Sequence, residues 1–362
     1  MNKNLKILVI NPGSTCTAIA LFEEDKLLDK EAIRHSSKEL SKYKKIFNQH
    51  NLREEIIINF LKKKNIDINS LDVIVGRGGV LKPVKSGAYR INKLMLEDLK
   101  GRPRVEHASN LGAVIAYDLA QKIGVPSFIV DSVAVDELEP VARISGIPDI
   151  ERESLCHVLN LKAAARRLAQ ELGKSYKELN LIVIHLGGGI SVSAHRKGRM
   201  IDVNNASAEG PFTPERTGGL PSVELVKLCY SQKYTFREML KKIIGRGGLV
   251  DYLGTNNLLE VEERIAKGDK KVELLYQAMA YQVAKEIAAM ASVLKGKVDA
   301  IVITGNGAKN KGALGNAFID WIKERVNFIA PITVYPGTDE MKALALGAVR
   351  VLKGEEEALE YT

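Results

Sequence analysis

Apolar and polar positions alternate along the chain with two different periods. Short apolar runs predict buried strands over 5–10, 17–22, 73–75, 127–130, 181–185, 190–194, 199–203 and 300–303. Apolar residues at helical spacing predict helices over 53–64, 107–122, 154–172, 277–294 and 341–352. Because strands alternate with helices, the pattern predicts an α/β fold.

One arrangement of elements occurs twice. A strand, a glycine-bearing loop, a second strand, a tight turn and a third strand begin near residue 5 and again near residue 181. Placing Asn11 over His185 puts Gly13 over Gly187 with no gap. Two such units, each followed by helices, indicate a duplicated domain, although two unrelated hairpins would give the same pattern.

Length and composition bound the class of protein. The chain has 362 residues, more than one ordinary hydrophobic core supports, so we expect two domains with a hinge near 146–148. No apolar run reaches the roughly 20 residues that span a bilayer, and the first run is too short for a signal peptide. Cys16, Cys156 and Cys229 lack metal or redox spacing. We therefore expect a cytoplasmic protein that has no membrane partner.

The formal net charge of +9 leaves two interpretations. A basic chain can bind nucleic acid, or it can present a lysine-rich surface that attracts small anions. Here Lys alternates with Glu and Asp throughout, no long basic block occurs, and aromatic residues make up only 6%. The composition favours small anionic ligands over nucleic acid.

Three predicted strands run into glycine-bearing turns. Glycine lets backbone N–H groups approach an anion closely, and hydroxyl side chains add donors. Single turns of this kind also serve chain geometry alone, but three in one α/β chain favour a polyphosphate ligand. None fits the Walker or dinucleotide pattern. The candidate phosphate-binding residues are Asn11, Gly13, Ser14, Thr15, Gly187, Gly188, Gly189, Gly305 and Gly307.

Charged and imidazole side chains near these turns supply the candidate chemistry. Arg77 ends a strand and Arg216 lies in a Pro/Gly-rich segment, where a planar guanidinium could bind carboxylate or phosphate, or form a surface salt bridge. His107, His157 and His185 could face a ligand, or be satisfied core or capping residues. Asp131 and Glu340 could hold a metal or its waters, or cap a turn and a helix.

At these residues the chain resembles the acetate and butyrate kinases, and the NPGST, EHASN and FTPER forms are nearer the butyrate branch. The resemblance covers about residues 5–352. Its motifs are NPGST (11–15), GRGG (76–79), EHASNLGA (106–113), VDSVAVDE (130–137), HLGGGIS (185–191), VNNA (203–206), GPFTPERTGGLP (210–221) and ALALGAVRVL (343–352).

The resemblance implies two duplicated ribonuclease-H-like domains with an interdomain cleft. Residues 1–148 would form an acyl-substrate-side domain, with a C-terminal helix over 342–362 packing back on it, and 149–341 a nucleotide-binding domain. The implied reaction is direct, reversible, in-line transfer of the ATP γ-phosphate to a short fatty acid, with Mg²⁺ as cofactor. Family resemblance also suggests a homo-oligomer, a dimer or larger.

The same resemblance assigns roles residue by residue. Arg77, Asp131, His185 and Arg216 would be catalytic, and Arg77, His107 and His157 would line the acid site. Asn11 and Ser14 would contact phosphate, with the glycine loops around it. Asp131 and Glu340 would organise Mg²⁺ through its waters.

Four departures from the family pattern keep other functions open. Cys16 stands where the family has serine, and Ala18 where it usually has lysine. The turn after Ile303 lacks the usual Gly-Gly-Leu-Ala-His, and Asn257-Leu258 replaces a more polar, Asp-containing adenosine contact. The alternatives are an acetate, propionate or branched-chain acid kinase, and an ATP-binding regulator without catalysis. A chaperone-type ATPase would need an added peptide-binding domain.

Overall fold

The computed structural model describes the chain except for residues 1–3, 102–106, 310–311 and 338, so Glu106 of the EHASNLGA motif lies outside the described residues. The chain divides into two compact units. Unit 1 comprises Met1–Val135 and Asp339–Thr362, and unit 2 comprises Asp136–Thr338. The sequence placed the corresponding boundary near residue 148.

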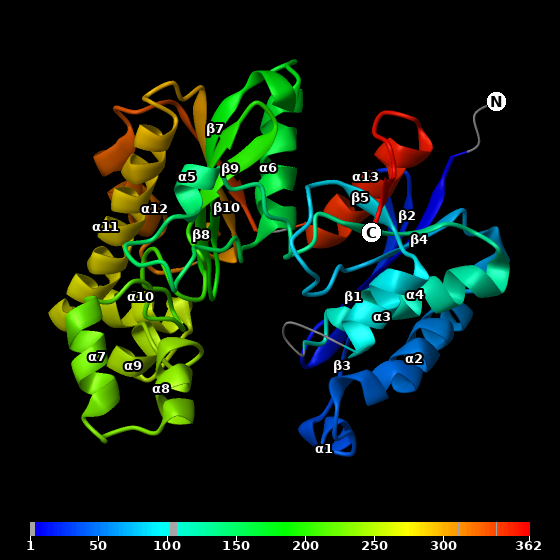
Figure 1. Cartoon of the computed structure of the whole chain (residues 1–362), viewed down its shortest axis with the longest axis horizontal. Coiled ribbons are helices and arrows are strands. Elements are labelled where there is room, and N and C mark those ends of the chain that lie inside the picture. The colour runs from blue at the N-terminus through cyan, green and yellow to red at the C-terminus, as the bar shows by residue number, and fades with distance from the viewer. Residues whose placement is uncertain (1–3, 102–106, 310–311, 338) are drawn as a thin grey trace. The chain divides into compact units, whose positions relative to one another are not determined.

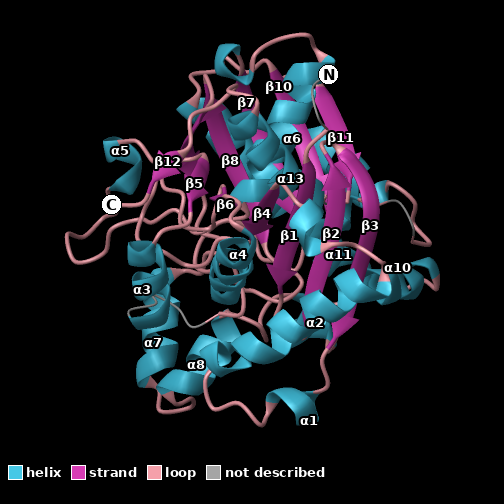
Figure 2. Cartoon of the chain, turned by 90° about the vertical axis from the view of Figure 1, so that its right-hand side faces the viewer, coloured by secondary structure: helices cyan, strands magenta, loops and turns pink. Residues whose placement is uncertain are grey.

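Unit 1 is built on a seven-stranded sheet in the order β12-β5-β6-β4-β1-β2-β3. Strands β1, β2 and β3 are antiparallel neighbours, visible side by side in Figure 2, while β4 runs parallel to β1 and β6 parallel to β4. The strands span β1 Lys6–Pro12, β2 Cys16–Glu23, β3 Lys26–Arg34, β4 Val73–Gly76, β5 Ala88–Arg90, β6 Ser127–Val130 and β12 Leu359–Glu360.

Helices cover both faces of this sheet, because its central strands β4 and β6 are buried on both sides. On β6, Ile129 packs in a cluster with residues of α2 and α4, whereas Val130, on the opposite face, lies against Gly347 of α13. The helices of the unit are α1 Ser37–Leu40, α2 His50–Lys63, α3 Lys93–Gly101, α4 Asn110–Ile123 and α13 Glu340–Leu352.

Unit 2 has a five-stranded sheet in the order β11-β10-β7-β8-β9. In Figure 1, α6 lies on one side of this sheet and α11 and α12 on the other. The strands are β7 Asn180–Leu186, β8 Ile190–Arg196, β9 Arg199–Val203, β10 Ala300–Gly305 and β11 Ile332–Pro336. The helices are α5 Pro140–Arg143, α6 Val158–Glu171, α7 Ser222–Tyr230, α8 Phe236–Ile243, α9 Leu249–Leu253, α10 Leu258–Ala266, α11 Lys270–Val293 and α12 Ala317–Val326.

The two sheets share one topology, which confirms the predicted duplication. The order β3-β2-β1-β4-β6 in unit 1 matches β9-β8-β7-β10-β11 in unit 2. The parallel pairing begins at Ile7 in the first sheet and at Leu181 in the second, which are equivalent when Asn11 is placed over His185. The second hairpin of each sheet also carries a register shift, after Leu21 and after Ala194.

Some predicted helix limits are wrong, and local chemistry explains why. The C-terminal helix expected over 342–362 ends at Leu352, because Gly354 adopts φ 73° and the chain then forms β12 beside β5. The helix expected from 277 begins at Lys270, because the side chain of Asp269 caps the N–H of Val272. The helix expected from 154 begins at Val158. Among the described residues, none of the helices is both long and apolar enough to cross a membrane.

Candidate functional site

The NPGST segment forms the tight turn between β1 and β2. The N–H of Gly13 donates to the carbonyl of Cys16 at 2.8 Å, which closes the turn. Asn11 sits near the end of β1, and Ser14 and Thr15 are exposed at the tip. The loop therefore presents hydroxyl groups and backbone to solvent, as an anion-binding turn requires.

Arg53 of α2 lies beneath this turn and is fully buried. Its Nη1 donates to the carbonyl of Cys16 at 2.9 Å and to Thr17 Oγ1 at 3.1 Å, while its other nitrogens donate to Gln49 Oε1. Burial lowers the pKa of the guanidinium, but an arginine remains cationic. A buried cation thus holds the same carbonyl that closes the loop.

Arg77 and Glu340 are brought together in unit 1. Arg77 Nη1 donates to Glu340 Oε2 at 2.6 Å, and Asn11 Nδ2 donates to the same oxygen at 2.9 Å. Glu340 is the first residue of α13, whose N-terminal dipole favours a carboxylate there, and the helix cap is supplied by Asp339. Three residues predicted for the site from distant segments therefore meet at one carboxylate oxygen.

The glycines of the GRGG motif let α4 approach β4 at backbone distance. A Cβ on Gly76 would lie 2.2 Å from the carbonyl oxygen of Gly112, and one on Gly112 would lie 2.5 Å from that of Arg77. A Cβ on Gly79 would lie 2.4 Å from Asn110 Oδ1, which instead accepts a hydrogen bond from the N–H of Val80. The GRGG and SNLG segments thus fix each other's position.

His107 feels the charge of Arg77, and Asp131 lies on the turn after β6. Desolvation lowers the pKa of His107, although the side chain is exposed at one side, and the charge of Arg77 lowers the pKa further. Asp131 is buried at φ 41°, and its Oδ1 accepts from Ser86 Oγ at 2.6 Å and from the N–H of Gly87 at 3.0 Å. Aspartate adopts positive φ more readily than most residues, and the two hydrogen bonds hold its carboxylate in place here.

In unit 2 two predicted histidines stack on each other. The rings of His157 and His185 lie 4.1 Å apart at 22°, and His157 Nδ1 is 2.9 Å from Ser191 Oγ. His185 is a buried residue of β7, and His157 precedes α6. Stacking brings the end of β7 and the start of α6 together.

Arg216 lies against the triple-glycine loop. A Cβ on Gly189 would be 2.6 Å from Arg216 Nη1 and 3.1 Å from His157 Cε1, so only glycine leaves room for this contact. The guanidinium donates to the carbonyl of Ala206 at 2.7 Å, and Thr213 Oγ1 donates to the carbonyl of Gly188 at 2.6 Å. Burial lowers the pKa of Arg216, a shift that Glu215 opposes.

The loop after β10 adjoins the same place. Gly305 has φ 105°, and a Cβ there would lie 2.1 Å from the carbonyl oxygen of Leu186, one residue before the triple glycine. A Cβ on Gly307 would lie 3.1 Å from Leu186 Cβ. The close packing of β10 on β7 accounts for Gly305 without any ligand, and it also places the two glycine loops side by side.

The structure thus forms two clusters from the predicted site residues. Unit 1 gathers Asn11, Arg77, His107 and Glu340, with Asp131 on the turn whose Ser132 packs at Gly78. Unit 2 gathers His157, His185, the 187–189 loop and Arg216. The sequence predicted no role for Arg53, and it placed Ser191 in the HLGGGIS motif without a role of its own. The helical spacing of the sequence could have indicated that Arg53 is buried, because it lies on the same face of α2 as Ile57, Phe60 and Leu61.

Comparisons with known proteins identify relatives of the whole chain. The model of the acetokinase family matches residues 156–323, and a model of a protein family of unknown function matches residues 2–91. Butyrate kinase 2 of Clostridium acetobutylicum is 54% identical over 98% of this chain and 99% of its own, and butyrate kinase 1 of that organism is 52% identical over the same shares.

A solved structure agrees in fold. Acetate kinase of Porphyromonas gingivalis superposes with a TM-score of 0.77 at 18% identity, covering 96% of this chain and 100% of its own. At 18% sequence identity, this similarity shows a shared fold and nothing about the activity. Together with the near full-length match to the two clostridial proteins, these similarities place the chain in the acetokinase family.

Proposed function

We propose that this protein transfers the γ-phosphate of ATP to the carboxylate of a short-chain fatty acid, with butyrate as the first candidate. The observation that carries the proposal is the Arg216 guanidinium packed against Gly189, beside the stacked His157 and His185. A cation and imidazole groups at the end of a strand, next to glycine backbone, suit a phosphoryl group. The butyrate kinases of Clostridium acetobutylicum supply the candidate acid.

The two clusters are assigned different substrates. In unit 1, Arg77 binds the carboxylate of the acid and His107 lines its site, while Asn11 and Ser14 contact phosphate. In unit 2, the 187–189 loop, Gly305 and Gly307 bind the nucleotide phosphates, and His157 stacks on His185 next to this loop. The support is the grouping of these residues and the glycines that hold their loops close.

The chemistry needs little from a general base, because a carboxylate is already an anion. Its oxygen attacks the γ-phosphorus in line, the bond to the β–γ bridging oxygen breaks, and ADP leaves. Arg216 and His185 stabilise the charge on the moving phosphoryl group, and Arg77 orients the acid. The product is a mixed anhydride, so the reverse reaction forms ATP from acyl phosphate.

The carboxylates of Asp131 and Glu340 fit a water-mediated role toward magnesium. Both offer the oxygen donors that Mg²⁺ prefers. One oxygen of each is already engaged, by Ser86 and Gly87 at Asp131 and by Arg77 and Asn11 at Glu340. Such engaged carboxylates suit hydrogen bonds to the metal's waters. Bound Mg²⁺ would neutralise charge on the phosphates.

Arg53 is proposed as a positioning residue for the phosphate loop. It donates to the carbonyl of Cys16, the acceptor that also receives the N–H of Gly13. The family's usual lysine is absent at Ala18, which faces Asn11 in the β1–β2 pair. Arg53 therefore supplies a fixed positive charge directly under the loop.

The direct test is ATP- and Mg²⁺-dependent acyl-hydroxamate formation with linear and branched acids of two to six carbons. We expect product, most of it from butyrate. A maximum at acetate, propionate or a branched acid would keep the reaction class and change the substrate. Nucleotide binding without product from any acid would favour the ATP-binding regulator, and the proposal would be wrong.

Assembly and location complete the proposal. We infer a homo-oligomer that uses an apolar face of unit 2, because α7 exposes Val223, Val226 and Tyr230 at helical spacing and α8 exposes Phe236 and Leu240. A monomeric mass in light scattering would contradict it. A cytoplasmic location fits the three cysteines, none of which forms a disulfide.

A further inference from the structure

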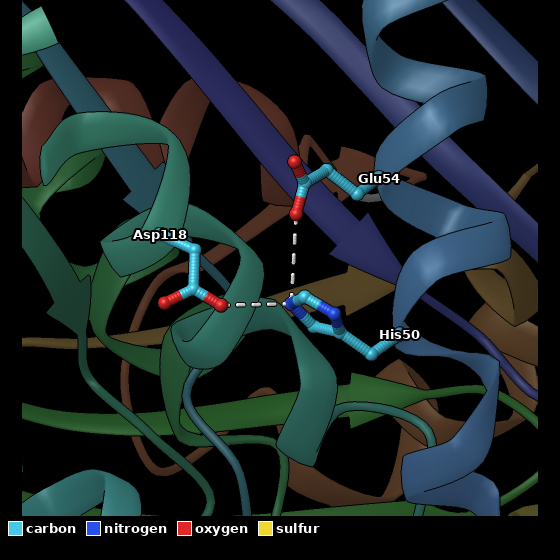
Figure 3. A group of neighbouring side chains, drawn as sticks. All are labelled: His50, Glu54 and Asp118. Carbon is cyan, nitrogen blue, oxygen red and sulfur yellow. Dashed lines mark ion pairs between the residues drawn. The ribbon is translucent and has the colours of Figure 1, made fainter. Parts of the chain in front are cut away.

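A histidine and two carboxylates meet on unit 1 outside both clusters. His50 and Glu54 are one helical turn apart on α2, and Asp118 projects toward them from α4 (Figure 3). His50 Nε2 lies 2.9 Å from Asp118 Oδ2 and 3.7 Å from Glu54 Oε2. All three side chains are partly buried, with exposed fractions of 21%, 13% and 35% for His50, Glu54 and Asp118.

The hydrogen bond at the far side of the ring sets the state of Nε2. His50 Nδ1 lies 3.0 Å from the amide oxygen of Asn51, which can only accept, so Nδ1 carries a proton. In the neutral ring, Nε2 then carries a lone pair, and this lone pair faces the two carboxylates. Such an arrangement is repulsive unless a proton or a cation lies between them.

The geometry between His50 Nε2 and Asp118 Oδ2 distinguishes a shared proton from a metal ion between the two groups. Nε2 is buried and makes no hydrogen bond of acceptable geometry, even though Asp118 Oδ2 is at hydrogen-bond distance. The oxygen therefore lies off the axis of the ring nitrogen. In a metal site that axis points at the ion, and the carboxylate oxygens stand beside it.

The spacing of the three atoms is also close to that of a ligand set. Ligands about 2.0–2.1 Å from a zinc ion are separated by about 3.3 Å from one another in a tetrahedral site. Here the two nitrogen–oxygen separations bracket that value, and all three atoms lie within 4.8 Å of each other. A small movement of the Glu54 carboxylate, the more distant of the two, would bring all three atoms to ligand spacing.

Neighbouring groups hold the ligands in place. Asn51 orients the ring through Nδ1, as the outer-shell partner of a metal-bound histidine does. Lys122 contacts Glu54 through Oε1, which leaves Oε2 turned toward His50. Lys122 is more than half exposed, so it can swing away when a cation binds.

We propose that His50, Glu54 and Asp118 form a binding site for a first-row divalent cation, with Zn²⁺ the best fit to one imidazole and two carboxylates. Water completes the coordination. The ion ties the start of α2 to α4, so its role is to fix these helices, and it takes no part in the phosphoryl transfer proposed above.

The test is calorimetric titration of the full chain with Zn²⁺, without nucleotide or Mg²⁺. His50→Gln, Glu54→Gln and Asp118→Asn remove one ligand each, and Glu55→Gln changes the exposed neighbour on α2. We expect the wild type and Glu55→Gln to bind one equivalent that the three ligand variants bind roughly a hundredfold more weakly or lose. Zn²⁺ should raise the melting temperature of the wild type and of Glu55→Gln, but not that of the three ligand variants.

Two results would overturn the site: no binding by the wild type, or equal binding by the wild type and the ligand variants. Equal binding would place the zinc elsewhere, for example at a cysteine, and no binding would leave the three side chains as a contact between α2 and α4 without a metal. Circular dichroism without metal checks the fold, and if one variant fails to fold the other two still decide the outcome.

Discussion

Arg77 and Glu340, 263 residues apart in the chain, are joined by a contact of 2.6 Å between Nη1 and Oε2. The charge of the guanidinium proposed to hold the acid is therefore balanced within unit 1 before any acid binds. An incoming carboxylate has to share Arg77 with Glu340 or displace it. Substrate binding and the position of the carboxylate proposed for magnesium are coupled through this pair.

Replacing Glu340 with Gln should raise the Mg²⁺ concentration needed for half-maximal activity by about tenfold. The amide keeps the shape of the side chain but removes the charge that attracts the hydrated ion. Asp339→Asn is the matched control, because asparagine also caps a helix. The measurement is the rate of hydroxamate formation across a Mg²⁺ series, and identical curves for both variants would contradict the role of Glu340.

Replacing Arg216 with Ala should lower turnover by roughly 10³-fold or more while ATP affinity changes little. The reason is that the guanidinium is proposed to meet charge that develops only in the transition state. Turnover is measured by hydroxamate formation and nucleotide affinity by calorimetry. Arg216→Lys should recover only part of the rate, since an ammonium lacks the planar fork. Near-normal turnover in Arg216→Ala would make the assignment wrong.

Replacing Arg53 with Met should destabilise the protein by about 2 kcal/mol, since the buried amide oxygen of Gln49 loses its donor. The loop should also lose its fixed geometry, so KM for ATP should rise more than kcat falls. Arg53→Lys, which keeps the charge, should lie between Met and wild type. Arg90→Met, at a half-exposed arginine of the same unit, should stay within about 0.5 kcal/mol. The stability is measured by urea unfolding. If Arg53→Met lowers the free energy of unfolding but leaves KM for ATP unchanged, Arg53 has a structural role only.

The lowered pKa of His107 predicts a loss of stability in acid. The ordinary value is 6.5, and the folded protein favours the neutral ring through desolvation and the charge of Arg77. As pH falls through 6.5 the unfolded chain takes up this proton before the folded chain does, so the free energy of unfolding decreases. His107→Gln should show a shallower decrease in urea unfolding measured over this range. Parallel curves for the variant and the wild type would contradict the shift.

The sequence predicted the central strands of both sheets, because these are short, continuous apolar runs that end in turns, but it did not predict the edge strands β11 and β12 or the short strand β5. The duplication followed from the same pattern, and pairing from Ile7 and from Leu181 bears out the alignment of Asn11 with His185. Helix limits were less certain. The start of α11 depends on the cap by Asp269, a local hydrogen bond that apolar periodicity does not record.

The individual side-chain contacts within the two clusters could not be predicted from the sequence. The resemblance implied that a C-terminal helix packs back on the first domain, but no pattern in the sequence predicted that Glu340 at its start would pair with Arg77. Arg53 was not predicted because it lies on the apolar face of a helix, away from the strand ends that carry the glycine turns. A charged residue at a buried helical position is itself a signal that chemistry or loop support lies nearby.

The backbone contact between Gly76 and Gly112 limits how the acid preference of this enzyme can be redesigned. A methyl group at either position would push α4 off β4 and carry Arg77 and His107 apart with it, so neither glycine is open to variation. Side chains near Arg77 and His107, the residues proposed to bind the acid, are therefore the positions to vary, while the backbone spacing of α4 and β4 stays fixed.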